Sequence, residues 1–178
     1  MVSLLSRRLL PYTIGAAMLA GIGACNSDEC YDNRNSLPLA GFYTATETPE
    51  AVSIDSVSIY AIGSPGDSVL HDSVRTLSQT YLPFRIDGNA SRVRYVIRYL
   101  QGNLGRLGIA DTISLSYDIE PKFVSAACGV VYIFRITDIS TTRYCIDSVT
   151  CPRGYIDNVA VENIHIYFRV NTVDDENT

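Results

Sequence analysis

Apolar and polar side chains alternate one by one along several separate segments of this chain, and this alternation restricts what the chain can fold into. Strict alternation occurs at residues 92–100, 113–119 and 164–170. A period of two is the pattern of a β-strand that buries one of its faces. No segment after residue 25 carries the apolar stripe of an amphipathic helix. We therefore expect an all-β domain, an antiparallel β-sandwich of the Ig-like or jelly-roll style.

Two further segments depart from simple alternation. Residues 52–54 and 57–59 alternate in opposite phase, and the change of phase at residues 55–56 predicts a turn or a β-bulge. Residues 130–136 are apolar on both faces apart from Arg135. An apolar strand of this kind is typical of the centre of a sheet, so we expect a central strand here.

The first 25 residues have the order of an export signal. Arg7 and Arg8 precede an uncharged run, residues 9–24, that ends in small residues before Cys25. This is the pattern of a secretory signal peptide, and it is shorter than the stretch of about 20 residues that spans a bilayer. We expect cleavage before Cys25 and attachment of diacylglycerol and palmitate at this residue. The alternative is an ordinary secreted protein that is cut nearby and keeps Cys25 as a thiol.

The rest of the chain divides by composition. Residues 25–38 form a polar tether, residues 39–172 a single β-sandwich domain, and residues 173–178 an acidic tail that we expect to be frayed. Removal of the signal peptide, residues 1–24, leaves 12 basic against 19 acidic residues, a net charge of −7. Nucleic-acid binding needs a basic face, so nucleic acid is excluded as a partner.

Four cysteines remain besides Cys25. An even number of cysteines in an oxidising compartment indicates two disulfides, for which three connectivities exist. The sequence favours one bridge across a short loop and another that fastens the N-terminal segment to the core. The competing interpretation is a zinc site, but no Cys-x-x-Cys pair is present and we expect no metal. The favoured bridges are Cys145–Cys151 and Cys30–Cys128.

A short tripeptide recurs along the chain. Asp-Ser-Val occurs four times, and residues 111–113, Asp-Thr-Ile, are a close variant. Locally, Asp and Ser satisfy backbone groups at turns, and a β-branched residue then enters a strand. The motif also resembles the acceptor of general O-glycosylation in exported proteins of Bacteroides-type bacteria. That resemblance implies attachment at the hydroxyls of Ser56, Ser68, Ser73, Thr112 and Ser148.

Two sets of side chains are candidates for ligand binding. Arg92, Arg94 and Arg98 share the polar face of one predicted strand, and arginines at i and i+2 lie about 7 Å apart. Such a pair can hold an anionic group, although the same face is also typical of solvated or ion-paired arginines. Tyrosine suits sugar and protein recognition, and Tyr167 beside His165 is the best exposed candidate. We expect Arg92, Arg94, Arg98 and Tyr167 to bind a glycan.

Catalytic motifs are missing from the sequence. There is no Gly-x-Ser-x-Gly elbow, no His-Glu-x-x-His helix and no phosphate-binding loop. His71, Asp72 and Ser73 are consecutive, and neighbours in a strand point to opposite faces, so they do not form a triad by themselves. We expect a protein that is not an enzyme and that needs no cofactor.

Several motifs together resemble a known family. Residues 22–25, Ile-Gly-Ala-Cys, resemble a lipobox, and Asn26-Ser27-Asp28-Glu29 resembles the surface-export signal of Bacteroides lipoproteins. The stretches Asn-Ser-Leu-Pro-Leu-Ala-Gly-Phe-Tyr (35–43), Ile-Asp-Ser-Val-Ser-Ile-Tyr (54–60) and Val-Ser-Ala-Ala-Cys-Gly (124–129) resemble a family of small lipoproteins of unknown function from these bacteria.

The resemblance implies an all-β lipoprotein of the outer envelope and assigns no catalytic residue. The chain departs from the family pattern at Cys145 and Cys151, which leaves their bridge open. We expect a protein anchored by lipid at the outer membrane or cell surface, acting as a non-catalytic binding module for a glycan. The alternatives are a structural or assembly subunit of a surface complex of envelope proteins and, third, an uncharacterised hydrolase.

Overall fold

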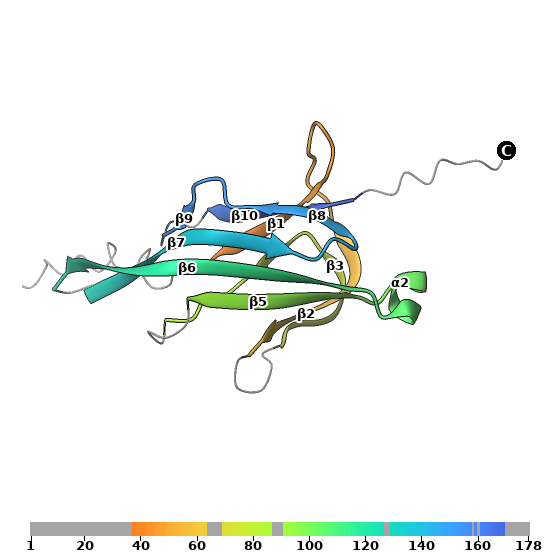
Figure 1. Cartoon of the computed structure of the whole chain (residues 1–178), viewed down its shortest axis with the longest axis horizontal. Coiled ribbons are helices and arrows are strands. Elements are labelled where there is room, and N and C mark those ends of the chain that lie inside the picture. The colour runs from red at the N-terminus through yellow and green to blue at the C-terminus, as the bar shows by residue number, and fades with distance from the viewer. Residues whose placement is uncertain are drawn as a thin grey trace, which may run out of the picture. The chain divides into compact units, whose positions relative to one another are not determined.

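The computed structural model describes residues 37–63, 69–86, 91–126, 129–157, 159 and 161–169, which are arranged as two packed β-sheets (Figure 1). The four-stranded sheet has the order β4-β1-β10-β8, and the six-stranded sheet has the order β3-β2-β5-β6-β7-β9. The predicted all-β sandwich is confirmed. The strands of the first sheet are β1 (Leu39–Thr44), β4 (Gln79–Tyr81), β8 (Ile146–Thr150) and β10 (Glu162–Phe168). Those of the second are β2 (Ile54–Ile62), β3 (Val69–Leu77), β5 (Arg92–Tyr99), β6 (Ala110–Ser125), β7 (Gly129–Thr141) and β9 (Tyr155–Ile156).

The core lies where the alternating patterns of the two sheets meet. In β5 the apolar face is buried, with Tyr95 and Ile97 almost fully shielded from solvent. Phe42 of β1 and Ile166 of β10 are opposite each other in the facing sheet and equally buried. Burying one large apolar side chain contributes about 1.5–3 kcal/mol, so this shared layer is the main force that holds the two sheets together.

One strand pair in the sandwich is parallel. β1 runs alongside β10 in the same direction, whereas the other strand pairs of the described residues are antiparallel. The first and last strands therefore lie side by side in the middle of the four-stranded sheet. This pairing sets Gly41 beside His165 and Tyr43 beside Tyr167. It brings side chains from the two ends of the chain together on the outer face of the four-stranded sheet.

The predicted change of phase at residues 55–56 is real, but it occurs within a strand and not at a turn. β2 continues through it, because Ser56 adopts a left-handed backbone with φ of 51°. Ile54 faces the core before this point and Val57 after it. Ser73 in β3 has the same φ of 51°. There the register of β3 against β2 slips, which marks a β-bulge.

The prediction that residues 130–136 form a central strand is confirmed only in part. They belong to β7, which lies between β6 and the two-residue strand β9, and among the described residues β9 pairs with it only at Phe134 and Arg135. The first part of β7 runs out beyond the sandwich with the end of β6 (Figure 1). Val130 is half exposed there. The apolar pattern on both faces therefore has a cause other than burial between neighbouring strands.

A short helix, α2 (Gly102–Leu107), connects β5 to β6 and was not expected from the sequence. It ends at Gly108, which adopts the left-handed conformation typical of a helix C-terminus and donates back to the Gly105 and Leu104 carbonyls. Six residues are too few to show a helical period, so only the flanking glycines signalled it.

The predicted bridge between Cys145 and Cys151 is wrong. Both cysteines are free thiols, and they flank β8 at its two ends. An extended strand of that length separates their Cα atoms by about 20 Å, whereas a disulfide needs about 4.4–6.8 Å. The other predicted bridge, Cys30–Cys128, lies outside the described residues, as does Cys25.

Candidate binding surface

Aromatic and charged side chains gather on the outer face of the four-stranded sheet. The ring of Tyr43 lies 4.9 Å from the His165 ring and 5.9 Å from the Tyr167 ring, measured between centroids. The Glu162 carboxylate accepts from the Tyr43 hydroxyl at 2.5 Å and lies 3.1 Å from His165 Nε2. We name these four residues, Tyr43, Glu162, His165 and Tyr167, the tyrosine platform. All four are partly exposed to solvent.

The backbone explains why this cluster forms. Side chains at paired positions of neighbouring strands share a face, so Tyr43 and Tyr167 stand next to each other. Gly41 is also on this face, opposite His165. A Cβ atom on Gly41 would lie 2.0 Å from a Glu162 carboxylate oxygen. The absence of a side chain at Gly41 therefore gives the Glu162 carboxylate room to lie over β1 and reach Tyr43.

The hydrogen bond to Glu162 controls the protonation of Tyr43. It raises the pKa of Tyr43 to about 12, and partial burial and the charge of Glu162 add to the rise. The Tyr43 hydroxyl is thus a fixed donor whose proton points at Glu162. The apolar faces of the rings and the polar atoms around them are available to contact a ligand.

Replacing Glu162 with glutamine should lower the pKa of Tyr43 from about 12 toward 10.0, the value of an unperturbed tyrosine. The amide removes the negative charge that favours the protonated phenol, and its neutral oxygen is a weaker acceptor than the carboxylate. Carbon-13 NMR of the Tyr43 ring, titrated from pH 9 to 13, measures the change. An unchanged pKa in Glu162→Gln would show that the carboxylate does not hold this ring. Tyr60, a partly exposed tyrosine of the other sheet, is the internal control.

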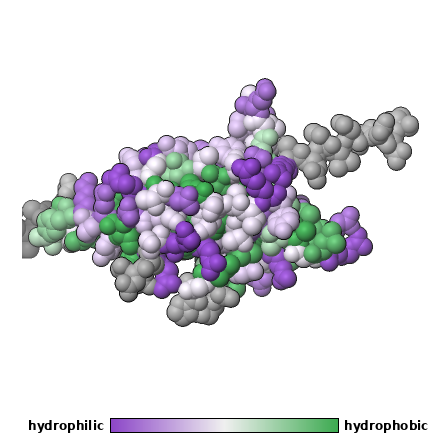
Figure 2. Space-filling view, viewed as in Figure 1, coloured by the Kyte–Doolittle hydropathy of each residue, from purple (hydrophilic) through white to green (hydrophobic). Residues whose placement is uncertain are grey.

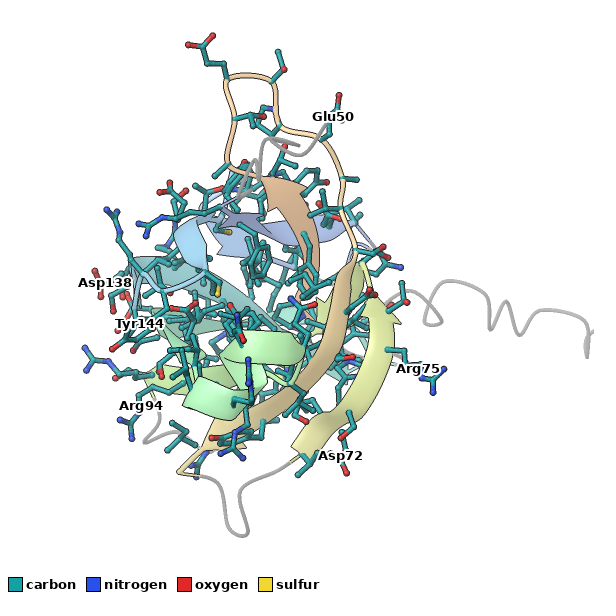
Figure 3. The ribbon with its side chains drawn as sticks, turned by 90° about the vertical axis from the view of Figure 1, so that its right-hand side faces the viewer. Glu50, Asp72, Arg75, Arg94, Asp138 and Tyr144 are labelled. Atoms are coloured by element: carbon teal, nitrogen blue, oxygen red, sulfur yellow. The ribbon has the colours of Figure 1, made fainter. Side chains whose placement is uncertain are left out.

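The three candidate arginines lie on a different surface. Arg92, Arg94 and Arg98 share the exposed face of β5, in the six-stranded sheet, and Figure 3 shows Arg94 directed away from the ribbon. Arg92 Nε donates to Ser116 Oγ at 3.1 Å. Tyr167 is on the outer face of the opposite sheet. The prediction that these arginines and Tyr167 form one site is therefore wrong.

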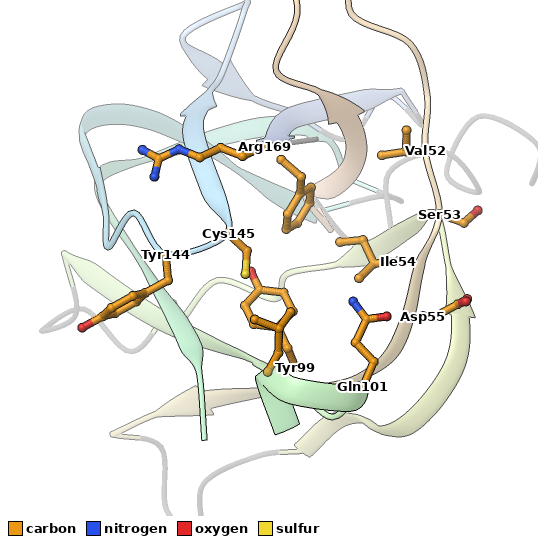
Figure 4. A pocket seen from close by; sticks show the side chains of 11 residues that line it. Val52, Ser53, Ile54, Asp55, Tyr99, Gln101, Tyr144, Cys145 and Arg169 are labelled. Carbon is orange, nitrogen blue, oxygen red and sulfur yellow. The ribbon is translucent and has the colours of Figure 1, made fainter. Parts of the chain in front are cut away.

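A hollow of about 610 Å³ opens at the α2 end of the sandwich (Figure 4). Its polar lining includes Asp55, Tyr99, Gln101, Cys145 and Arg169. Burial raises the pKa of the Cys145 thiol, and the nearby Asp111 raises it further. A protonated thiol is a weak nucleophile, so the arrangement does not favour covalent chemistry.

Asp111, behind this hollow, has a structural role. Its carboxylate is fully buried and accepts five hydrogen bonds. Burial by itself raises the pKa of Asp111, but the backbone N–H groups of Ile146, Tyr144 and Cys145 outweigh it, and the pKa is lowered. All five donors converge on this carboxylate, so it is saturated and fixes the start of β8 against β6.

Two further groups of polar residues singled out by the sequence are placed by the structure. The His71 Nε2 atom lies 2.8 Å from Thr80 Oγ1 of β4. The Asp72 Oδ1 atom accepts a hydrogen bond from Ser73 Oγ at 3.0 Å. His71 thus contacts β4, while Asp72 and Ser73 contact each other. Within the described ranges, no group of three or more His, Cys, Asp or Glu side chains is arranged to hold a metal ion. Among the same residues, no helix has the length and apolar character needed to cross a membrane.

The structure places four of the five candidate O-glycosylation residues. Ser73 is exposed, and Ser56, Thr112 and Ser148 are partly exposed. Ser68 lies outside the described residues. Ser148 pairs with Tyr167 across β8 and β10, so a glycan attached to it would border the tyrosine platform. O-glycosylation of these hydroxyls stays a prediction.

Sequence reasoning missed Tyr43, Glu162 and Gly41. Tyr43 and Tyr167 are 124 residues apart, and nothing in the alternation says that their strands are neighbours. The one available signal was local, because Glu162 lies just before the alternating segment, residues 164–170, that contains His165 and Tyr167.

Comparison with known proteins places this sandwich in a family. A model of a family of unknown function, DUF6452, matches residues 56–168. The chain therefore belongs to this family, and the match runs from Ser56, within β2, to Phe168, the end of β10. No curated protein and no solved structure matches the chain.

Proposed function

We propose that this protein is a non-catalytic binding module of the bacterial outer envelope, anchored by lipid at Cys25, and that the tyrosine platform binds a neutral glycan. The single observation that carries the proposal is the grouping of Tyr43, His165 and Tyr167, with ring centroids 4.9–6.2 Å apart, on one exposed sheet face. Sugars present flat C–H faces and a ring of hydroxyls. Partly exposed aromatic rings flanked by polar atoms are suited to both.

The charge on the platform selects the kind of glycan. The Glu162 carboxylate lies between Tyr43 and His165, and a negative charge at that place repels an anionic sugar. Its acceptor oxygens favour the hydroxyls of a neutral one. An acidic glycan would instead be suited to Arg94 and Arg98, which make no ion pair within the described part of the chain.

Other features agree with a binding role. The platform residues sit on strands, where sheet pairing fixes their spacing, and sites on strands are held more precisely than sites on loops. The hollow beside α2 is lined by Cys145 but by no histidine that could act as its base. This counts against the hydrolase alternative.

A glycan array probed with the purified chain tests the proposal. We expect neutral glycans among the hits, and we expect Tyr43→Ala and Tyr167→Ala each to weaken binding by about tenfold, since stacking on one aromatic ring contributes of order 1–2 kcal/mol.

Arg92→Ala/Arg94→Ala is the matched control, because it removes two exposed side chains from the other sheet and should leave these hits unchanged. Binding lost in the arginine variant and kept in the tyrosine variants would move the site to β5 and its ligand to acidic glycans. An array without hits would remove glycan binding altogether and favour the assembly alternative.

A further inference from the structure

The β6–β7 hairpin exposes apolar side chains where it leaves the sandwich. Phe123 is 67 % exposed and Val130 is 50 % exposed, and the two residues pair across the strands. Val124, the next residue of β6, is 38 % exposed. Figure 2 shows hydrophobic surface at the end where the hairpin lies. We name Phe123, Val124 and Val130 the hairpin tip.

The exposed apolar side chains of the hairpin tip lie at an irregular point of the two strands. Phe123 and Val130 share one face because they are paired, and the register shifts between Phe123 and Ser125, so Val124 lies at a β-bulge. Val131, the next residue of β7, is buried. The hairpin tip thus has one exposed apolar edge and a covered side, and an element of this kind is suited to lie in the surface layer of a lipid bilayer with its apolar side toward the acyl chains.

The hairpin tip lies at the end of the sandwich where the chain enters from Cys25. The Pro38 carbonyl, just before β1, accepts from Leu82 N at 2.8 Å. Phe84, two residues further on, stacks on Tyr117 and meets Phe134 edge-on, where the hairpin leaves the sandwich. The connection to Cys25 therefore starts from the hairpin end and not from the α2 end.

The length of that connection limits how far the sandwich can stand from the membrane. Thirteen residues separate Cys25 from Leu39, and at about 3.5 Å per residue they reach no more than about 50 Å. A lipid on Cys25 thus keeps the hairpin end within reach of the bilayer surface.

We propose that the hairpin tip inserts into the interfacial layer of the lipid bilayer and so fixes the orientation of the sandwich on the membrane. The insertion is shallow, because backbone groups at a hairpin end need water or headgroups as partners. Lys122, the one lysine of the chain, is exposed beside Phe123 and reaches the lipid phosphates. The hairpin then holds the tyrosine platform sideways to the membrane. This inference rests on the membrane location proposed above.

The chain contains no tryptophan, so a single introduced tryptophan reports on its own surroundings. We would compare Phe123→Trp with Tyr144→Trp, both in the full chain. Tyr144 is the matched control because it is an aromatic residue of similar exposure, 64 %, at the α2 end. The probe is vesicles of phosphatidylethanolamine and phosphatidylglycerol with bromine on their acyl chains.

We expect the Phe123→Trp emission to shift to shorter wavelength and to be quenched by the brominated lipid, and the Tyr144→Trp emission to do neither. Flotation of the same samples reports on the lipid anchor separately. Protein that floats with the vesicles while Phe123→Trp stays unquenched would overturn the hairpin proposal and keep the anchor. Protein that neither floats nor is quenched would overturn both.

Two further outcomes decide between the bilayer and a protein partner. A wavelength shift in Phe123→Trp that appears on concentration without vesicles would assign the hairpin tip to a second copy of the chain and overturn the membrane proposal. In the chain that carries Cys25→Ser, adding Phe123→Asp should weaken vesicle binding about tenfold or more, as expected when burial of one large apolar side chain is lost. Equal binding would contradict it.

Discussion

Replacing Asp111 with alanine is expected to lower the free energy of unfolding by about 3 kcal/mol or more, because each buried polar group left without a partner costs about 1–3 kcal/mol. The carboxylate accepts from the Tyr99 hydroxyl at 2.9 Å, the Thr142 hydroxyl at 2.8 Å and three backbone N–H groups. Alanine leaves all of these donors unpaired. Urea denaturation followed by circular dichroism measures the loss.

Asp138→Ala is the control for this variant. Asp138 is an exposed aspartate on β7, and Figure 3 shows it at the surface. Its removal should change stability by no more than about 0.5 kcal/mol. Equal effects of the two substitutions would contradict a structural role for Asp111.

The same carboxylate gives the sandwich a defined response to acid. The pKa of Asp111 is lowered in the folded chain below its ordinary value of 3.8. Its contribution to stability is therefore complete above pH 3.8 and is lost as the pH falls through the folded pKa. Asp111→Asn lacks this titration, so its stability should fall less steeply than that of the original chain below pH 3.8. Parallel curves would contradict the assignment.

The second large effect is expected at Phe134. This β7 side chain is 3 % exposed and meets Phe84 and Tyr117 edge-on, with centroids 5.1 and 5.4 Å away. Phe134→Ala removes both contacts and leaves a cavity, which typically costs about 3–5 kcal/mol. Thermal and urea unfolding measure the change.

Phe123 on β6 is the matched comparison, because it belongs to the same hairpin and is 67 % exposed. Phe123→Ala should leave the stability in solution within about 0.5 kcal/mol of the original. A large loss in Phe123→Ala would mean that this side chain is packed within the protein, and the membrane role of the hairpin tip would fall with it.

The fold class followed from the sequence because burial imposes a period of two on each strand. Arg92 to Tyr99 forms β5 with its apolar face buried, as the alternation predicted. The same logic held only in part at residues 130–136, because β9 pairs with β7 only at Phe134 and Arg135. A strand buried on both faces and a strand that leaves the sandwich have the same apolar pattern, and only the position of Val130 beyond the sheet tells them apart.

The candidate site was harder to predict than the fold because it depends on strand order. Tyr167 was identified from its own segment, but its neighbour Tyr43 is brought to it by the parallel pairing of β1 with β10. Local periodicity carries no information about which strands are adjacent. For the same reason the arginines of β5 and Tyr167 were combined, although they lie on opposite sheets.

The cysteine prediction failed for a geometric reason. Five residues between Cys145 and Cys151 allow a short closed loop, but they form the extended strand β8. Spacing in the sequence gives an upper limit on distance, and the backbone conformation decides the actual value.

The most direct test of the binding account is an NMR titration of the isotope-labelled chain with a mixture of neutral oligosaccharides. We expect ring resonances of Tyr43, His165 and Tyr167 to move together, while the side-chain signals of Arg94 and Arg98 stay still. Movement confined to the arginines, or to residues around the hollow beside α2, would contradict the central claim that the outer face of the four-stranded sheet is the binding surface.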